Sequence, residues 1–482
     1  MSVQAIPGYA LQPSAQQVPL KTNYITNFDF LNQYLPDTYE KEFERYGNRT
    51  VASFLRMVGA EMPSNSDLIK WAEQGRLHTK YIDCNTTVDL TNSDTAIFNV
   101  NDTLIPSGGG VSGAGAIAIR VGQTVMFTAN AGGANYKAIV TEVDVDNNTF
   151  TVAFYNALGI TTLATAKWTV FIYGSEFKKG TNGMQGSLEA DDEIFENSPI
   201  IIKDKYAVSG SDMAQIGWVE VTTENGANGY LWYLKSEHET RLRFDDYLET
   251  AMIEAVPAEA LSGAAATIGD VGNKGSQGIF YTVNKRGNVW GGGYPTTLAD
   301  FDTIVSRLDK QGSIEENVIF VDRAFSFSID DMLAGLNGYS STGASNFASF
   351  GLFDNDKEMA LNLGFTGFRR GYDFYKSDWK YLNDPTMRGG LPTSAGSGKV
   401  SGLLVPAGST TVYDQVLGKN AKRPFLHVRY RASETEDRRY KTWITGSAGG
   451  AENSDLDAME VNFLSERAVC TLGANNFFLF QN

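Results

Sequence analysis

The chain has few of the residues on which many enzymes and secreted proteins depend. Its 482 residues include 2 cysteines and 3 histidines. The two cysteines, Cys84 and Cys470, are too few for a disulfide framework, so we expect assembly in a reducing cytoplasm. The sequence contains no run of about 18 apolar residues, so we expect no membrane span. The first 21 residues lack the basic and apolar regions of a signal peptide, and we expect no secretory route.

Positive charge is also scarce. Lys and Arg number 40 against 56 Asp and Glu, which gives a formal net charge of −16. A surface of this sign repels phosphate backbones, which argues against a general nucleic-acid binder. Such a chain could still face nucleic acid without adhering to it. Apolar residues at 42% and charged residues at 20% are ordinary for a globular protein and exclude a disordered chain.

Glycine and aromatic residues are the abundant classes. The chain has 49 Gly, 28 Phe, 22 Tyr and 7 Trp, but only 13 Pro. This composition is typical of a loop-rich protein that contains β-sheet and has many side chains for packing. The length corresponds to about three domains at roughly 150 residues each.

The N-terminal quarter is expected to begin with an arm and continue with helices. Residues 1–26 are polar, show no periodicity and indicate an extended arm. Within residues 27–83, Val51, Phe54, Leu55 and Val58 form one apolar stripe at helical spacing. Ser64 and Asp67 have the spacing of a capping box, which predicts another helix through Leu68, Ile69, Trp71 and Ala72.

Residues 84–175 differ in character and predict a small inserted all-β domain. Between residues 83 and 173 the only bases are Arg120, Lys137 and Lys167. Apolar residues alternate on both sides of Asp146-Asn147-Asn148, which predicts a β-hairpin. We therefore expect a closed or sandwiched β-module within a longer host chain.

The second half predicts helices that cover a sheet. Residues 176–235 are mixed, with a strand beginning near Pro199. Residues 236–278 contain the strongest helix, Ser236–Val256, which has one apolar face and ends at Pro257. That face is made by Phe244, Tyr247, Leu248, Ala251, Met252 and Ala255.

Residues 279–414 predict a helix–strand–helix succession. A capping box at Thr297 and Asp300 begins one helix, and Val318–Val321 follows as a strand. Ser328 and Asp331 have the same spacing and predict a helix through Leu336. Residues 415–482 return to strands, and the whole pattern indicates an α+β fold. The expected late strands are Leu403–Pro406, Phe425–Tyr430, Tyr440–Ile444 and Phe477–Phe480.

The sequence contains no convincing catalytic or cofactor motif. Gly108, Gly110 and Gly113 satisfy GxGxxG, but the flanking segments are strand-like, so a glycine loop is the better interpretation. Gly396, Gly398 and Lys399 resemble a phosphate loop without the Ser or Thr that should follow the lysine. The three histidines, His78, His238 and His427, lie far apart and predict no metal site. We therefore expect no catalytic residue, no cofactor and no metal.

Carboxylates are the one remaining source of catalysis. Asp191, Asp192 and Glu193 are the best pair candidates for a glycosidase, which needs two carboxylates. A solvated acidic loop explains the same residues and is the preferred interpretation.

The order of these parts resembles the major capsid protein of tailed bacteriophages, which has the Hong Kong 97-type fold. An arm, a β-rich excursion, one long helix and a compact α/β region are followed by a terminal strand. The segment Glu460–Ala468, with Ser465-Glu466-Arg467-Ala468 and then the apolar run Leu472–Phe480, is similar to the family's ending. The whole sequence looks most like the capsid proteins of crAss-like phages.

The resemblance implies roles for the segments. Residues 1–26 would be the N-terminal arm, and residues 27–83 would continue into an extended loop. Residues 84–175 would be inserted in that loop, whose arms would be 76–83 and 177–205. Residues 176–235 would form the rest of the loop and the peripheral strands, and residues 236–278 the spine helix and connector. Residues 279–414 would form mainly the axial domain, and residues 415–482 the C-terminal peripheral and axial strands.

The resemblance also implies partners and location. The chain would assemble with itself into hexamers and pentamers of an icosahedral virion shell, in the cytoplasm of a bacterial host. Portal, scaffold and decoration proteins would be further partners, and double-stranded DNA would be enclosed without sequence-specific binding. Two alternatives stay open: a β-rich phage tail or surface-binding protein, and a carbohydrate-active enzyme.

Overall fold

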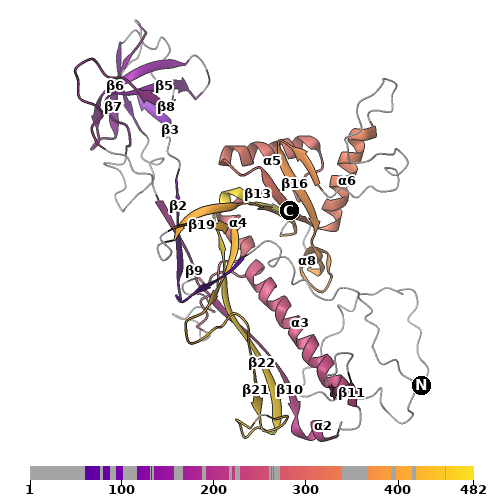
Figure 1. Ribbon diagram of the computed structural model, residues 1–482. Helices are drawn as coiled ribbons and strands as arrows, with labels where there is room; N and C mark the ends of the chain where they lie inside the picture. The colour runs from indigo at the N-terminus through magenta and orange to yellow at the C-terminus, as the bar shows by residue number, and fades with distance from the viewer. Residues whose placement is uncertain are drawn as a thin grey trace. The chain divides into compact units, whose positions relative to one another are not determined.

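The computed structural model describes an α+β protein that divides into two compact units. One unit comprises Met1–Lys70 with Glu196–Asn482, and the other comprises Trp71–Phe195. Figure 1 shows both with their elements labelled. The described residues are 60–75, 80–86, 94–100, 117–130, 132, 135–156, 167–186, 192–215, 220–222, 228–259, 262, 264, 272–338, 367–391, 398–414, 419–450 and 452–482.

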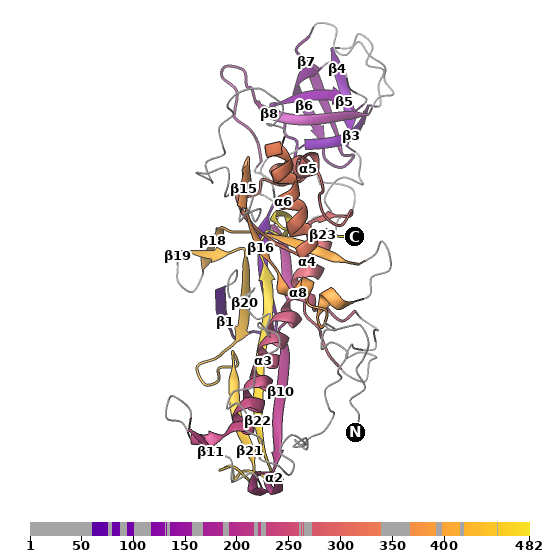
Figure 2. The same ribbon diagram turned by 90° about the vertical axis from the view of Figure 1, so that its right-hand side faces the viewer.

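The unit Trp71–Phe195 contains a closed six-stranded barrel (Figure 2). Its strands are β3 (Lys80–Thr86), β4 (Thr95–Asn99), β5 (Gln123–Ala129), β6 (Tyr136–Asp144), β7 (Thr149–Phe154) and β8 (Trp168–Ser175). They close in the order β3-β4-β7-β6-β5-β8, and every pair is antiparallel. The expected small β-module is therefore present as a barrel.

Alternating side chains fill the barrel. Phe98, Phe127 and Phe150 are fully buried, and their rings stack at centroid distances of 4.4 to 6.4 Å. Each strand sends alternate residues inward, which is why a period of two in the sequence predicted the module. The predicted hairpin is confirmed: β6 and β7 are joined by a turn in which Asn148 has a positive φ of 51°.

Cys84 lies in this barrel core and is fully buried. Burial, reinforced by the charge of Asp83, raises the pKa of the Cys84 thiol to about 12. The thiolate is the form that reacts with alkylating reagents, so burial and the raised pKa together make this cysteine inert.

We therefore predict that Cys84 resists iodoacetamide in the native protein at pH 8 and reacts fully in urea. Peptide mapping by mass spectrometry would measure the labelling. A matched control is Val145→Cys, since Val145 is 43% exposed on the same barrel and its replacement should be labelled in minutes. Equal labelling rates at both sites in the native protein would contradict the buried position.

The other unit contains a long five-stranded sheet. Its strands are β1 (Ala60–Ser64), β10 (Ile200–Ser209), β20 (Leu426–Arg431), β21 (Lys441–Gly446) and β22 (Ala458–Thr471). The 14-residue strand β22 pairs antiparallel with β10 along one edge. Along its other edge β22 pairs with β21 and then with β20, and β1 pairs parallel with β20.

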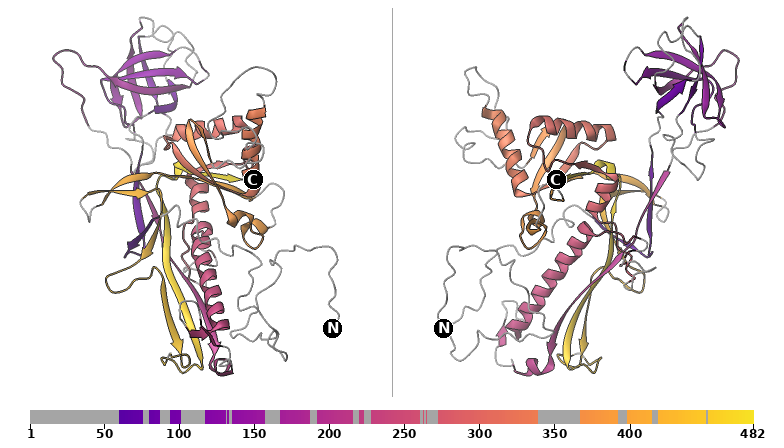
Figure 3. Two further views of the ribbon diagram at one scale, coloured as in Figure 1. Left: turned by 45° about the vertical axis from the view of Figure 1, so that its right-hand side comes forward. Right: turned by 180° about the vertical axis from the view of Figure 1, so that it is seen from behind.

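Helix α3 (Leu231–Glu254) covers one face of this sheet beside β10 and β22, as both views of Figure 3 show. Phe244 is fully buried between Tyr440 and Phe463, at ring centroid distances of 5.3 and 5.7 Å. Leu248 and Met252 continue the buried stripe along the helix. The predicted helix is confirmed, although it begins five residues earlier than Ser236 and its predicted stripe residue Tyr247 is 46% exposed.

A six-stranded mixed sheet forms the remaining core of this unit. The strands follow the order β13-β23-β17-β14-β16-β15. The C-terminal strand β23 lies between β13 and β17, so the end of the chain is built into the sheet interior. The bounds are β13 (Asn288–Trp290), β14 (Glu316–Val321), β15 (Gly367–Arg370), β16 (Tyr372–Asp378), β17 (Val400–Pro406) and β23 (Phe478–Gln481).

Helices pack on both faces of the six-stranded sheet. Helices α5 (Leu298–Gln311) and α6 (Arg323–Gly338) contribute Phe301 and Phe325 to one hydrophobic cluster on this sheet. Helices α4 (Ile279–Arg286) and α8 (Lys380–Asn383) contact β23 and β17. The capping box predicted at Thr297 and Asp300 is confirmed, with both reciprocal hydrogen bonds formed.

Short elements complete the described chain. Two pairs of six-residue strands form separate ribbons: β2 (Ile69–Gln74) with β9 (Asp192–Asn197), and β18 (Ser409–Asp414) with β19 (Lys419–Pro424). The three-residue strands β11 (Glu220–Thr222) and β12 (Asn228–Tyr230) form a third, shorter pair. The boundary between the two units falls within β2 and β9. The others are α2 (Gly210–Gln215) and the 3-10 turns η6 (Arg388–Gly390) and η7 (Ala474–Asn476).

The helix predicted from Ser64 and Asp67 is wrong, because the segment forms strand β2. Burial alternates along β2: Ile69 is buried and Trp71 half-buried, whereas Lys70 and Ala72 are exposed. The burial period is therefore two. The hydroxyl of Ser66 accepts from Leu68 N–H at 3.3 Å, and this local turn replaces the helix cap. The stripe at 51–58 lies outside the described residues.

The start predicted for the helix at Ser328 is also wrong. Helix α6 begins at Arg323, where the Asp322 carboxylate accepts from Phe325 N–H at 2.7 Å. Ser328 and Asp331 lie in the interior of the helix. An aspartate at the end of a buried strand provides the cap, and the spacing rule selected a second polar pair six residues, nearly two turns, too late.

The separate cores of the two units predict the effect of removing the barrel. The barrel core is built only from residues between Tyr81 and Val170, and the other two clusters contain none of these residues. Replacing residues 76–190 by a short Gly/Ser linker should leave a cooperative unfolding transition. Its midpoint should shift by under about 3 °C, which corresponds to ~2 kcal/mol for a unit of this size. Scanning calorimetry would measure it, and loss of a cooperative transition would contradict the separation.

Candidate interaction surfaces

The structure does not bring the candidate catalytic residues into a site. Asp191 lies outside the described residues, and the exposed Glu193 belongs to ribbon strand β9, which Asp192 begins. Within the described ranges, no three His, Cys, Asp or Glu side chains are grouped as metal ligands. A carboxylate pair facing a cavity, which glycoside hydrolysis needs, is therefore not formed by these residues as far as the structure describes them.

The histidines and glycine motifs are likewise dispersed. His238 is exposed on α3, whereas His427 is buried in β20 with Nδ1 3.3 Å from the Pro424 carbonyl oxygen. His78, Gly108, Gly110, Gly113 and Gly396 lie outside the described residues. The ammonium of Lys399 lies 3.2 Å from the buried carboxylate of Asp322, with which it forms an ion pair.

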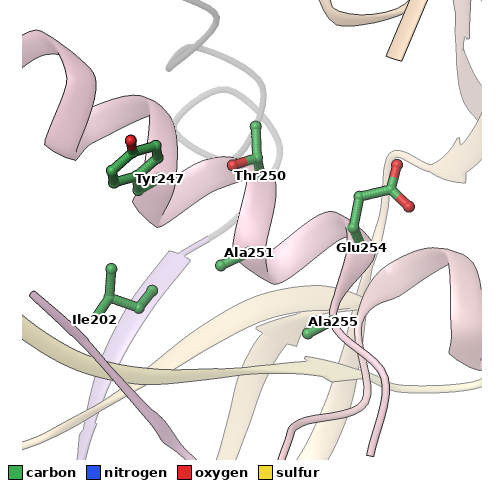
Figure 4. A pocket seen from close by; sticks show the side chains of 6 residues that line it. All are labelled: Ile202, Tyr247, Thr250, Ala251, Glu254 and Ala255. Carbon is green, nitrogen blue, oxygen red and sulfur yellow. The ribbon is translucent and has the colours of Figure 1, made fainter. Parts of the chain in front are cut away.

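One cavity of about 480 Å³ lies between α3 and β10 (Figure 4). Glu254 is its one charged lining residue, and the others are Ile202, Tyr247, Thr250, Ala251 and Ala255. The Glu254 carboxylate is already engaged, because it accepts from the Tyr381 hydroxyl at 2.7 Å and from Arg388. Burial and the adjacent carboxylate raise the pKa of Tyr381. The cavity is an apolar depression with one committed carboxylate, which suits packing better than catalysis.

A network of charges fastens β1 to the long sheet. Glu61 of β1 pairs with Arg439 and lies 3.5 Å from Arg467 of β22. Glu466, which is 8% exposed at its side chain, lies 3.5 Å from Arg431 and 2.8 Å from Nε of Arg438. The Arg438 contact does not have hydrogen-bond geometry, so it is an ion pair only.

Among the described residues, this network is one of the main contacts of β1. In β1 the side chains of residues 61–64 are exposed or half-buried, and Pro63 has no N–H to donate. Backbone pairing with β20 and the charges on Glu61 and Asp67 therefore hold the strand. Hydrogen bonding to Asp67 raises the pKa of Arg431, as does its charge. Sequence reasoning missed this network, for which the Arg438-Arg439 doublet was the only signal.

We predict that Glu466→Gln destabilises the protein by about 2 kcal/mol. The change removes the Glu466 counter-charge from Arg438 and leaves Arg431 with Asp67 alone, and the effect is below the ~3–5 kcal/mol of a fully buried pair because both arginines are about a third exposed. Urea unfolding followed by fluorescence would measure the loss. The control is Glu436→Gln, which removes an exposed pair with Lys441 and should cost under ~1 kcal/mol. Equal losses in the two variants would contradict the role given to Glu466.

Unpaired strand edges occur in the long sheet and in the two ribbons. Among the described residues, β10, β21 and β1 each pair along one edge only, and each ribbon consists of two strands. Apolar side chains accompany these edges: Ile194 of β9 is 67% exposed, Ile201 of β10 is 53% exposed and Ile444 of β21 is 44% exposed. Such edges can accept further strands, and the three isoleucines place apolar surface on the same strands. Among the described residues no helix has the length and apolarity needed to cross a bilayer.

Comparisons with known proteins give remote similarities to shell proteins. No protein-family model and no curated protein matches the chain. A solved structure from Microbacterium phage Oxtober96 is 10% identical and has a TM-score of 0.38, with 92% of this chain and 95% of that chain covered. The capsid of an empty GTA particle is 8% identical with a TM-score of 0.36, covering 92% and 94%. The SrpI encapsulin complex of Synechococcus elongatus is 10% identical with a TM-score of 0.32, covering 60% and 76%. At these values no residue role or activity is taken from them.

Proposed function

We propose that the chain is the major capsid protein of a tailed bacteriophage, which assembles with copies of itself into an icosahedral shell around double-stranded DNA. The finer resemblance of the sequence to crAss-like phages is part of the same proposal. The role is structural and is exercised in the virion, after assembly in the bacterial cytoplasm. Hexamers and pentamers would be its building units, and portal, scaffold and decoration proteins its further partners.

The observation that carries the proposal is the pair of two-stranded ribbons with unpaired outer edges. A two-stranded ribbon is marginally stable in water, because it buries little apolar surface. Among the described strands, β2 pairs only with β9 and β18 only with β19, and Ile194 projects from the first ribbon with 67% of its surface exposed. Figure 2 shows β18 and β19 as a separate ribbon. Segments of this kind gain stability by lying against another chain.

The distribution of the chain's chemistry supports the same conclusion. The charged side chains inside the unit of the long sheet join its elements to one another, as Lys376 and Asp330 do at 2.6 Å. The cavity beside α3 is lined by apolar groups and one engaged carboxylate. A shell protein requires stable elements and several contact surfaces rather than a reaction centre. Net negative charge suits a wall along which packaged DNA must slide.

Residues 1–26 and the parts of the extended loop are assigned by the resemblance. We propose that residues 1–26 form an arm that contacts neighbouring copies, and that β2 and β9 belong to the extended loop, with the barrel inserted beyond them. Main-chain pairing between an arm and a sheet edge gives affinity without a preformed pocket.

We predict that deleting residues 1–26 leaves a folded subunit that no longer forms stable particles. Circular dichroism should be nearly unchanged, while negative-stain electron microscopy should show rings or shells for the full chain and few for the truncated chain. A control that replaces residues 1–26 with a Gly/Ser segment of equal length should fail in the same way, because it restores length without side chains. Normal shells from either variant would refute the role of the arm.

A further inference from the structure

A row of basic and apolar side chains crosses the outside of the barrel. The strand register places Lys80 of β3 opposite Phe171 of β8, Phe171 opposite Met126 of β5, and Met126 opposite Lys137 of β6. Their sequence neighbours Tyr81, Val170, Val125 and Ala138 are buried in the barrel core. Because side chains alternate along a strand, the four residues of the row share the outer face.

Aromatic rings extend this row. The ammonium of Lys137 lies 5.6 Å from the ring centroid of Tyr173, and the Lys137 carbonyl accepts from Tyr155 N–H at 3.1 Å. The ring of Phe177 lies over Gly122, the residue before β5. The exposed fractions are 37% for Phe171, 45% for Tyr173, 50% for Tyr155 and 42% for Phe177. We call this surface, with Lys80, Met126 and Lys137, the aromatic row.

Positive charge gathers at the aromatic row, although the chain as a whole is acidic. The described part of this unit has six basic residues, and Lys80 and Lys137 lie on the row itself. Lys178 and Lys179 follow Phe177 directly in the sequence. One acid also lies here, Glu176, whose carboxylate accepts from the Tyr155 hydroxyl. Exposed aromatic rings with ammonium groups between them fit a partner that is both acidic and apolar.

The turn between β21 and β22 has the complementary chemistry. No Lys or Arg occurs between Thr442 and Glu466, and this stretch includes Glu452, Asp455 and Asp457. Leu456 stands among these acids and is 43% exposed. The turn thus offers an apolar side chain surrounded by carboxylates.

The turn is held in one conformation by its own hydrogen bonds. The Asn453 side chain accepts from Gly446 N–H at 2.9 Å and donates to the Ile444 carbonyl at 3.0 Å. The Leu456 carbonyl accepts from the Ser447 hydroxyl at 2.8 Å. A preformed turn loses little entropy when it binds, so its few side chains can contribute to a specific contact.

We infer that the aromatic row of one copy binds the acidic turn residues 452–457 of a second copy. Leu456 would pack on Phe171 and Met126, and Glu452 and Asp455 would face Lys80 and Lys137. The inference rests on the proposed function, since it requires that copies of the chain meet. In the shell, the inserted barrel would then hold two subunits together through a contact of complementary charge. Charge complementarity of this kind sets partner choice and association rate.

A charge-exchange experiment on the full chain tests the inference. The first variant is Lys80→Glu with Lys137→Glu, and the second is Glu452→Lys with Asp455→Lys. Each alone should lower the rate of particle formation, followed by light scattering, by about tenfold or more, and the chain with all four changes should recover to within about threefold of wild type. Lys167→Glu changes a barrel base outside the row and serves as the control, with no expected effect.

A cross-linking experiment reads the contact without requiring particles. Chains with Met126→Cys are mixed with chains carrying Leu456→Cys and oxidised mildly. A disulfide between positions 126 and 456 must then join two copies, because neither chain contains both. The native cysteines Cys84 and Cys470 are buried and should stay reduced. Mass spectrometry of the peptides identifies the bond.

The outcomes separate the inference from the proposed function. Suppose that the wild-type chain forms particles. The absence of a 126–456 disulfide, or of recovery in the fourfold variant, would then contradict the contact between the aromatic row and the acidic turn, while the capsid function would remain supported. Normal particle formation by the Lys80→Glu, Lys137→Glu variant would also contradict this contact and would assign the aromatic row to a partner outside the shell. A 126–456 disulfide without particles would support the contact and refute the capsid function.

Discussion

Strand β22 is the element on which the long sheet depends. Its 14 residues are paired along one edge by β10 and along the other by β21 and β20. Every strand of a sheet must satisfy its backbone groups, and β22 does so partly with β10, whose Lys205 precedes Glu460 of β22 by 255 positions in sequence. Phe463 and Val461 on this strand provide the surface on which α3 packs, and Glu466 provides the carboxylate that gathers Arg431 and Arg438. Strand β22 therefore takes part in the sheet pairing, in the packing of α3 and in the charge network.

The cores are well buried, whereas several strand edges have no partner strand among the described residues. The barrel and the six-stranded sheet each have a core of fully buried aromatic side chains, such as Phe98 and Phe478, so neither requires a partner for its core. The ribbons, the strand edges and the exposed isoleucines are different, because among the described residues they have apolar or main-chain groups that face solvent. This division between finished cores and unfinished edges is expected of a subunit whose remaining contacts are made by other copies.

Local signals predicted the fold where local physics decides it. Thr297 and Asp300 begin α5 as expected, because a capping box is satisfied within four residues. The barrel hairpin at Asn148 followed from its turn chemistry and the alternation around it. The segment after Ser64 was misassigned, since its strand character depends on burial and pairing that the capping spacing does not report.

Contacts between distant segments could not be predicted from the sequence. The pairing of Glu61 with Val428 and with the charge of Arg439 joins residues more than 360 positions apart, and no spacing rule relates them. The aromatic row is a similar case. Phe171, Met126 and Lys137 occupy ordinary outward positions of three strands, and only the register of the closed barrel makes them neighbours.

The central claim is that this chain acts by joining copies of itself, and its association state tests the claim most directly. Sedimentation velocity of the purified full-length chain over a hundredfold range of concentration would measure it. The account predicts that monomers give way to rings of five or six subunits or to closed shells as concentration rises. A single monomeric species across the whole range would contradict the account.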